Sequence, residues 1–359
     1  MPRRGRPEGP ACASFTRLFQ SSIGPILASN PVVRNVLVTG GTGFIGSNLA
    51  VALLKEGCAV RILRRPNSDL RAIDNAPVEH CIGDIRDPGS LKKALRGCDT
   101  VFHTAAMVSY WRREREEMYG INIQGTRNVV NACLELGVEK LIHTSSVAAI
   151  GFSEAGGVAR ETNRFNWDQY DVGYRISKHH AEEEVRKGVH RGLRAVMVNP
   201  SVVIGPRDIH FHGGQLLRDI HRKRLFYYVS GGMNIAYVDD VVKGHILAAR
   251  QGRMGERYIL GGENLTHKEI ISTVAEVVGG IRPLFKVPPP VVRLIAATAV
   301  SVGTLIQRKP WVTKELLASS GMYNYYSSDK AQRELGYRFT PFEEAVRKTF
   351  EWYSRSGYL

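Results

Sequence analysis

Three polar side chains near the middle of the chain have the types and spacing that acid–base chemistry requires. Tyr174 and Lys178 stand four residues apart in the stretch YRISK, so a helix would place both on one face. A tyrosine with an ordinary pKa of about 10 exchanges protons poorly at neutral pH, and a nearby ammonium group lowers that pKa. Ser145 and Ser146 end the stretch LIHTSS, and a serine there could hydrogen-bond a reacting oxygen, although a serine after a strand can also cap a helix. The pattern predicts proton transfer at a substrate oxygen.

A glycine-rich turn in the first quarter of the chain indicates a nucleotide-binding site. The stretch TGGTGFIG contains both Gly-x-Gly-x-x-Gly and Gly-x-x-Gly-x-x-Gly, and it joins a strand-like run, Asn35–Thr39, to a helix-like segment, Asn48–Glu56. Glycines leave room for a pyrophosphate, and the helix start offers it unpaired backbone N–H groups. The residues expected to bind the cofactor here are Gly40, Thr42, Gly43, Phe44, Ile45 and Gly46.

Two arginines determine which dinucleotide we expect. About twenty residues after such a turn, NAD-binding proteins usually carry an acid that binds the ribose 2′-hydroxyl. Here Arg64 and Arg65 follow the second predicted strand, Ala59–Leu63, and residues 58–68 contain no acid. An arginine can bind a 2′-phosphate that a carboxylate would repel. We therefore expect NADP(H), with NAD(H) as the alternative if these arginines are only solvated.

Two later segments fit the same nucleotide. Asp84 and Ile85 follow the third predicted strand, where Asp84 could accept a hydrogen bond from the adenine amino group. The small residues of HTAA follow the fourth strand and would let the backbone pass close to the cofactor. Thr104, Ala105 and Ala106 are therefore also candidate cofactor contacts.

The elements that must position these residues alternate regularly. Strand-like runs are followed by helix-like segments through residue 200, which favours the doubly wound, Rossmann-type α/β fold with a parallel sheet. The predicted strands are 35–39, 59–63, 78–81, 100–103, 140–143 and 195–198, and the helices 48–56, 88–96, 122–136 and 174–187.

The pattern loosens after Asp208, which suggests a second part. We expect an NADP-binding domain at residues 34–205 and 235–260, and a smaller, mostly helical C-terminal lid at residues 206–234 and 261–359. Thr340 is predicted to cap the last helix in a capping box with Glu343. Residues 110–120 form either a solvated helix or a flap over the substrate, with Tyr110 or Trp111 facing the pocket.

Composition excludes several classes of protein. Hydrophobic residues make up 43% and charged residues 23%, as in ordinary globular enzymes, while the net charge of +15 suits anionic ligands or surfaces. No nucleic-acid motif organises the basic residues, so no nucleic-acid partner is expected. The five cysteines are odd in number and widely spaced, which argues against disulfides and for a reducing, cytoplasmic setting. No cluster suggests a metal; His210 and His212 lack further ligands nearby.

Two segments leave alternatives open. Residues 1–33 are rich in Arg, Ser and Pro and are expected to be a disordered extension, with a transit peptide or an upstream start site as alternatives. No run is apolar over the ~18 residues that span a bilayer. Val291–Gln307 is expected to pack as a helix, with peripheral membrane contact as the alternative.

In combination, these motifs resemble those of the extended short-chain dehydrogenase/reductases, the NAD-dependent epimerase/dehydratase family. The shared features are the glycine motif, the serine ahead of Tyr-x-x-x-Lys, and NPSVVIGPRD at residues 199–208. The segments EEMYGINIQGTRNV and GERYILGGENLT are most similar to the dihydroflavonol-4-reductase-like branch, which includes bacterial proteins called hopanoid-associated sugar epimerases.

The resemblance implies roles for individual residues. Tyr174 is the general acid or base, Ser146 rather than Ser145 is the catalytic serine, and Lys178 orients the nicotinamide ribose and lowers the tyrosine pKa. Further residues implied by the resemblance are Asn122 near the proton relay, Pro200 and Ser201 at the carboxamide, and Arg65 as the NADP-selecting arginine.

The activity implied is that of an NADP(H)-dependent oxidoreductase that interconverts a carbonyl and a secondary alcohol of a small molecule, as a homodimer. The alternative is a sugar or nucleotide-sugar epimerase with a tightly held NAD(P). A third hypothesis is a catalytically silent protein that senses NADP.

Overall fold

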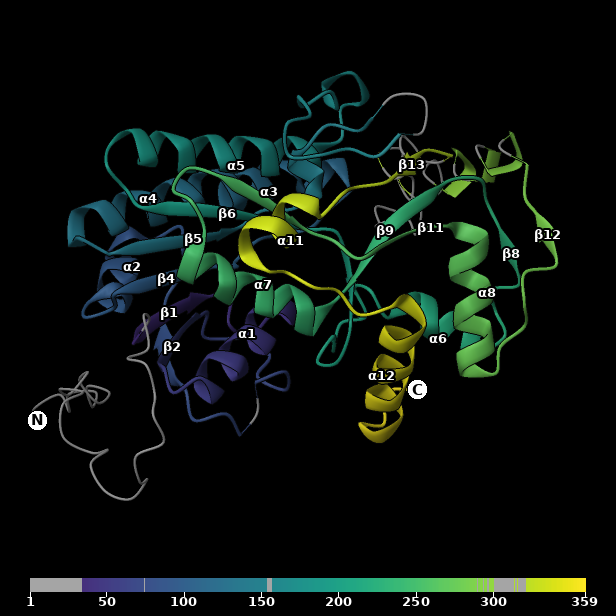
Figure 1. Ribbon diagram of the computed structural model, residues 1–359, viewed down its shortest axis with the longest axis horizontal. Coiled ribbons are helices and arrows are strands. Elements are labelled where there is room, and N and C mark those ends of the chain that lie inside the picture. The colour runs from purple at the N-terminus through teal and green to yellow at the C-terminus, as the bar shows by residue number, and fades with distance from the viewer. Residues whose placement is uncertain are drawn as a thin grey trace, which may run out of the picture. The chain divides into compact units, whose positions relative to one another are not determined.

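The computed structural model describes residues 34–359 except 74, 154–156, 289, 293, 296, 300–312, 314 and 316–320 (Figure 1). The predicted N-terminal extension, residues 1–33, and the second half of Val291–Gln307 lie outside the described residues. Within the described residues, no helix is both long and apolar enough to span a membrane.

A parallel sheet of seven strands organises most of the described chain up to residue 260. Its strand order is β10-β6-β5-β4-β1-β2-β3, and every neighbouring pair is parallel. The strands are β1 (Asn35–Thr39), β2 (Ala59–Arg64), β3 (Glu79–Ile82), β4 (Thr100–His103), β5 (Lys140–Thr144), β6 (Ala195–Pro200) and β10 (Arg257–Leu260). The order reverses between β1 and β4, and ligands of such sheets bind beyond the carboxyl ends of the strands at this reversal.

Helices cover both faces of this sheet, as expected for the doubly wound fold (Figure 1). One face carries α1 (Phe44–Lys55) and α7 (Val238–Gln251), with α11 (Asp329–Leu335) packed against α7. The other carries α2 (Pro88–Leu95), α4 (Gly125–Leu136) and α5 (Gly173–His190).

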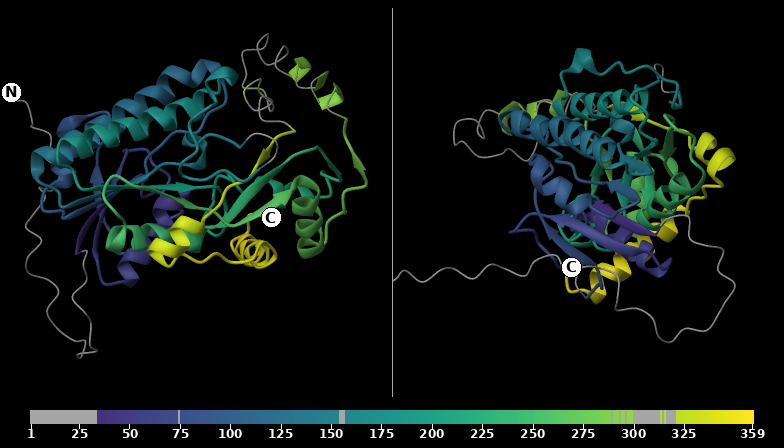
Figure 2. Two further views of the ribbon diagram at one scale, coloured as in Figure 1. Left: turned by 45° about the horizontal axis from the view of Figure 1, so that its top comes forward. Right: turned by 90° about the vertical axis from the view of Figure 1, so that its left-hand side faces the viewer.

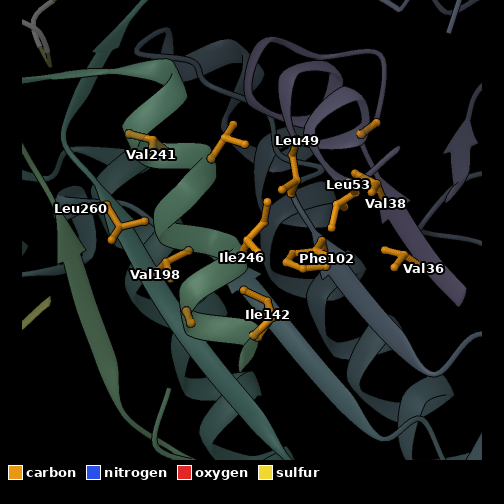
Figure 3. Close-up of a cluster of buried hydrophobic side chains, with 14 of the residues drawn as sticks. Val36, Val38, Leu49, Leu53, Phe102, Ile142, Val198, Val241, Ile246 and Leu260 are labelled. Carbon is orange, nitrogen blue, oxygen red and sulfur yellow. The ribbon is translucent and has the colours of Figure 1, made fainter. Parts of the chain in front are cut away.

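The two cores follow from the alternation of side chains along each strand. Val36 and Val38 of β1 belong to the cluster under α1 and α7, whereas Leu37 belongs to the cluster under α2 and α4. Figure 3 shows the first cluster, in which Leu49 of α1 and Ile246 of α7 lie over Phe102 and Ile142 of the sheet. Because both faces are covered, the strands are apolar on both sides.

The rest of the described chain contains a small second sheet with helices beside it. This sheet has the order β11 (Glu263–Thr266), β9 (Gly232–Tyr237), β13 (Tyr323–Asn324), with β7 (Val202–Ile204) also paired to β9. Helices α6 (Gln215–His221), α8 (His267–Val278) and α12 (Phe342–Arg355) lie at the same end of the molecule (Figure 2). Strands β8 (Tyr227–Tyr228) and β12 (Phe285–Lys286) pair beside α8. The expectation of a mostly helical lid did not include this sheet, in which β7, β11 and β13 have only two to four residues each.

The predicted cap of the last helix is wrong. Helix α12 begins at Phe342 and Pro341 occupies the N-cap position, while the N–H of Phe342 donates to Glu263 Oε1 (3.3 Å) from another part of the chain. The backbone N–H of Thr340 instead donates to Asp240 Oδ2 (2.6 Å), which keeps Thr340 outside the helix. A complete capping box lies at the start of α8, between Thr266 and Glu269.

Candidate functional site

The glycine turn has the geometry that a pyrophosphate site needs. Gly40 has a left-handed backbone (φ +70°), and a Cβ atom there would lie 2.7 Å from the backbone of Ala105. A Cβ on Gly46 would lie 2.2 Å from the carbonyl oxygen of Gly40, so the helix and the turn meet without side chains between them. Helix α1 follows Gly43 with no side-chain cap and no acid in its first turn, which leaves its N–H groups available to phosphates.

The predicted cofactor residues of this region come together. Thr42 lies in the turn and Phe44 and Ile45 open α1. Thr104 Oγ1 donates to the carbonyl of Thr39 (2.6 Å), which holds the segment after β4 against the turn. The glycines thus leave a space beside the turn that side chains would fill, and this space fits a dinucleotide.

The two arginines after β2 differ in what they already bind. Arg64 Nε donates to His80 Nδ1 (3.0 Å), and its Nη1 donates to the carbonyls of Arg65 and Pro66. The backbone of Arg65 is fixed by Ser68 Oγ (3.0 Å), while its guanidinium is exposed and binds no described residue. Arg65 is therefore the one of the two that remains available to an anion.

Asp84 and Ile85 lie on the loop after β3. The carboxylate of Asp84 pairs with Arg86 (2.8 Å), and this pairing lowers the pKa of Asp84, with a smaller contribution from Arg65. Ile85 is buried against Gly125, where a Cβ atom would lie 2.5 Å from the Ile85 side chain. Asp84 is thus near Arg65 but already holds a cation, so part of its capacity to accept from an adenine is used.

Tyr174 and Ser146 meet beyond the carboxyl end of the sheet. Tyr174 is in the first turn of α5, and a hydrogen bond from Ser146 acts to lower its pKa. Ser146 Oγ also accepts from Ala148 N (3.1 Å) and contacts the carbonyl of Pro200 (3.4 Å), so it caps a short helical turn as well as facing the tyrosine. Ser145 is buried, and its Oγ has no hydrogen-bond partner among the described residues.

The pKa of Tyr174 is raised, which corrects the expectation that it would be lowered. Burial is the main cause, the nearby Tyr110 adds to it, and the hydrogen bond from Ser146 and the charge of Arg175 only partly oppose it. Lys178 is also buried; its Nζ donates to the carbonyl of Thr144 (2.8 Å). Burial lowers the pKa of Lys178 to about 8, against the opposing charge of Glu182.

Asn122 holds the surroundings of these residues together. It lies in a π-helical turn, Gly120–Gln124, ahead of α4, a distortion frequent at functional sites. Its amide exchanges two hydrogen bonds with the backbone of Met107 (2.8 and 2.9 Å) and donates a third to Ser177 Oγ (2.9 Å). In this arrangement Asn122 fixes α5 to the loop after β4 and contacts neither Tyr174 nor Lys178.

Pro200 and Ser201 lie where β6 ends, beside Ser146. The carbonyl of Pro200 accepts from Ser146, and the Oγ of Ser201 is buried without a described partner. A buried hydroxyl without a partner is costly unless a ligand or water satisfies it, which fits a carboxamide contact.

Other residues near the site were not identified from the sequence. Asn199 Nδ2 donates to the carbonyl of Ser146 (2.9 Å) and to Glu182 Oε1 (2.6 Å), so it connects the serine loop to α5. Glu182 is fully buried four residues after Lys178, and this helical spacing was the signal that could have revealed it. The ring of Tyr110 meets that of Tyr174 edge-on, with 5.8 Å between centroids, which agrees with the flap hypothesis for this segment. No group of metal-ligating side chains occurs among the described residues.

Comparisons with known proteins agree with this geometry. Residues 36–261 match the model of the NAD dependent epimerase/dehydratase family. The chain is 35% identical over 327 residues to a putative dihydroflavonol 4-reductase of Synechocystis, covering 90% of this chain and 95% of that protein. It is 31% identical to sterol demethylase protein B of Methylococcus capsulatus, covering 90% and 99%.

A solved structure and a cofactor complex extend the comparison. The crystal structure of gox2253 is 40% identical, with a TM-score of 0.80, covering 90% of this chain and 99% of that one. The UDP-glucose 4-epimerase of Thermus thermophilus in complex with NAD is 25% identical, with a TM-score of 0.70, covering 89% and 99%. The chain therefore belongs to the NAD-dependent epimerase/dehydratase family of extended short-chain dehydrogenase/reductases, enzymes that act on CH–OH groups with a nicotinamide cofactor.

Proposed function

We propose that the protein is an NADP(H)-dependent oxidoreductase that interconverts a carbonyl and a secondary alcohol, with Tyr174 as its general acid or base. The observation that carries this proposal is the meeting of Tyr174 and Ser146 next to buried Lys178, beyond the sheet edge that also holds the glycine turn. When bound, the nicotinamide supplies or accepts a hydride. Tyr174 gives its proton to the substrate oxygen during reduction, and Ser146 donates a hydrogen bond to the same oxygen.

Tyr174 is in its acid form at neutral pH. Because burial raises the pKa of Tyr174, the phenol keeps its proton and can act as an acid. The same phenolate forms when Tyr174 gives up its proton in reduction and takes up the proton in oxidation, so burial opposes its formation in both directions. Lys178, with its pKa of about 8, is mostly charged at neutral pH and becomes neutral at higher pH.

Arg65 supports the choice of NADP(H). Its exposed guanidinium binds no described residue, whereas Arg64 is held by His80 and two carbonyls. An unpaired guanidinium next to the ribose position suits a 2′-phosphate. The related epimerase of Thermus thermophilus was solved in complex with NAD, the alternative cofactor that the titration below compares.

The cofactor proposal is tested by titrating the protein with NADPH and NADH and following nicotinamide fluorescence. We expect Arg65→Ala to weaken NADPH binding about 10- to 100-fold, the effect of losing a charge-assisted contact, with little change for NADH. Arg64→Ala is the matched control and should change both affinities much less. Tighter NADH binding by the unaltered protein, or equal losses in both variants, would overturn the assignment.

The catalytic proposal is tested by net consumption of NADPH with a dihydroflavonol and a 3-keto sterol as probes. The names of two relatives, a putative dihydroflavonol 4-reductase and a sterol demethylase protein, support such ring ketones over nucleotide sugars. An epimerase would interconvert a nucleotide sugar with no net change in NADPH. A protein that binds NADPH but turns over none of these substrates would favour the sensing hypothesis.

Two further expectations remain proposals. Burial raises the pKa of the Cys133 thiol to about 12 and that of Cys98 to about 11, so both are poor nucleophiles, which supports a structural role for these two residues. The reducing, cytoplasmic setting rests on the number and spacing of the cysteines. Sedimentation of the purified protein would test the homodimer that the resemblance implies.

A further inference from the structure

The catalytic helix begins without a cap of its own. Val172 occupies the N-cap position of α5, it offers no side-chain hydrogen bond, and the first turn contains no acid. The N–H of Gly173 is bound instead by Glu315 Oε2 (2.9 Å), a carboxylate 142 residues further along the chain. Glu315 therefore satisfies an otherwise unpaired donor directly beside Tyr174.

The other oxygen of Glu315 binds Arg115, which joins three segments. Arg115 Nη2 donates to Glu315 Oε1 (2.5 Å) and to the carbonyl of Asp171 (2.7 Å), and Nη1 donates to Asp171 Oδ1 (2.6 Å). The Glu315 side chain is only 4% exposed, so this charge depends on its partners. The guanidinium packs on Gly173, where a Cβ atom would lie 2.8 Å from Arg115 Nε.

Arg115 also fixes the segment that covers Tyr174. It begins α3 (Arg115–Tyr119), and the chain before this helix carries Tyr110, whose partly buried ring lies edge-on against Tyr174. The same ion pair therefore restrains the start of α5 and the neighbour of its catalytic tyrosine.

We propose that Glu315 is a positioning residue, which through Gly173 and Arg115 locks the Tyr110 segment onto the start of the catalytic helix and so holds Tyr174 in place. This inference rests on the proposed function for its catalytic meaning, while the lock itself can be measured without a substrate. A carboxylate at a helix N-terminus also interacts favourably with the helix dipole.

The test compares Glu315→Ala and Glu315→Gln with Glu184→Gln. Glu184 is a matched control because it is buried on the same helix and pairs with Arg127 (2.8 Å), far from the N-terminus. We expect Glu315→Ala to speed amide exchange at Gly173 and Tyr174 at least tenfold and to expose Tyr174 to nitration by tetranitromethane, mapped by peptide mass. Glu315→Gln keeps an acceptor for the N–H of Gly173, so its amide exchange and nitration should lie between those of Glu315→Ala and the unaltered protein. Glu184→Gln should resemble the unaltered protein.

Turnover separates positioning from general stability. With an accepted ketone, kcat of Glu315→Ala should fall about 10- to 100-fold with little change in KM, since small displacements of a catalytic group have such effects. Unchanged exchange and nitration in Glu315→Ala, or equal changes in Glu184→Gln, would overturn the lock. If the lock is present but Tyr174→Phe retains turnover, the proposed function fails and the lock stands.

A different observation concerns the edge of the lid, where apolar side chains are exposed together. Leu284 is 71% and Leu294 68% exposed, the highest values among the exposed large hydrophobic residues, and Phe285 follows at 52%. Phe285 pairs with Tyr227 across β12 and β8, and their rings stack. Val291, Leu294 and Ile295 are all exposed at the i, i+3 and i+4 positions of the helical stretch that follows. We call these residues, Tyr227, Leu284, Phe285, Val291, Leu294 and Ile295, the lid edge.

The charge around the lid edge has one sign. The described residues of 220–238 and 279–299 contain no Asp or Glu and hold five Lys and Arg residues, of which Arg282 pairs with Glu276 (2.9 Å). Of these, Arg222, Lys223, Arg224 and Lys286 are exposed and pair with no carboxylate in the described part of the chain. Exposed apolar residues among unpaired cations match the interface of an anionic bilayer.

We infer that the lid edge docks on anionic lipid surfaces, without spanning them. The test is flotation of the purified protein with vesicles of phosphatidylglycerol and phosphatidylcholine, and with phosphatidylcholine alone. We expect binding to the anionic vesicles that weakens with salt and falls at least about tenfold in Leu284→Glu/Leu294→Glu and in Arg224→Glu/Lys286→Glu. Ile82→Glu, at a residue 51% exposed on β3, is the control and should bind normally.

Three results would overturn this inference. They are absence of binding to anionic vesicles, equal binding by the lid-edge variants, and binding that Ile82→Glu loses as well. Sedimentation velocity supplies the competing explanation: a dimer that only the lid-edge variants dissociate would show that a second copy covers this surface.

Discussion

The glycine turn and the start of α5 solve the same problem, an open helix N-terminus, in opposite ways. At α1, the uncapped start is left open because the glycines of the turn add no side chain of their own there, an arrangement that suits an anion. At α5, the uncapped start is closed by Glu315 from a remote part of the chain. The first arrangement is made by residues adjacent in sequence, and the second by residues 142 apart. The comparison separates binding, which local sequence can encode, from positioning, which here depends on tertiary contacts.

The largest effect is expected from removing Tyr174, the proposed general acid at the closed start of α5. Tyr174→Phe should reduce turnover by about 10²- to 10⁴-fold because it deletes the proton donor while keeping the ring. NADPH titration should stay close to that of the unaltered protein. Retained turnover with a normal titration would mean that another group transfers the proton, and would leave the lock at α5 without a catalytic purpose.

The next largest effect tests the open N-terminus of α1. Gly46→Ala places a Cβ atom 2.2 Å from the carbonyl of Gly40, a clash with backbone that cannot be relieved by rotating a side chain. We expect NADPH binding to fall at least about tenfold and Tm to drop by several degrees. Gly57→Ala is a useful control, because its backbone is left-handed (φ +81°) but no atom lies within 4 Å of the added Cβ. Strain without a clash should lower Tm and leave NADPH affinity unchanged.

These differences explain how much of the molecule could be predicted. The strands and glycine contacts follow from apolar runs and a turn whose residues are neighbours, so the fold and the cradle were predictable. The partners of α5 were not, since nothing in the sequence relates Glu315 to Gly173 or Asn199 to Ser146. The direction of the Tyr174 pKa also failed, because spacing indicated a nearby cation but not the degree of burial.

A third prediction concerns the cost of burying Lys178. Its pKa in the folded protein is about 8 against an ordinary 10.5, so the unfolded chain binds a proton that the folded chain releases between these values. Stability therefore rises with pH across this window, by on the order of 3 kcal/mol for this group. Replacing Lys178 with Met should remove this rise. The unfolding free energy from urea curves should therefore increase between pH 7.5 and 10.5 in the unaltered protein, relative to its change in the variant. Lys187→Met, at an exposed position of α5, should leave the rise in place.

The smallest effect again contrasts a local cap with a tertiary contact. Thr266 caps α8 through its side chain, which accepts from Glu269 N (3.2 Å), so Thr266→Ala should cost about 1 kcal/mol of unfolding free energy. Thr340 has the same sequence pattern, but the described contact is made by its backbone with Asp240, and this bond survives replacement of the side chain. Thr340→Ala should therefore cost less than about 0.5 kcal/mol, within the range of ordinary surface substitutions. Urea unfolding measures both, and equal costs would mean that the backbone contact of Thr340 does not replace a cap in solution. A clear difference would show that two similar sequence patterns are separated only by the tertiary partner that one of them meets.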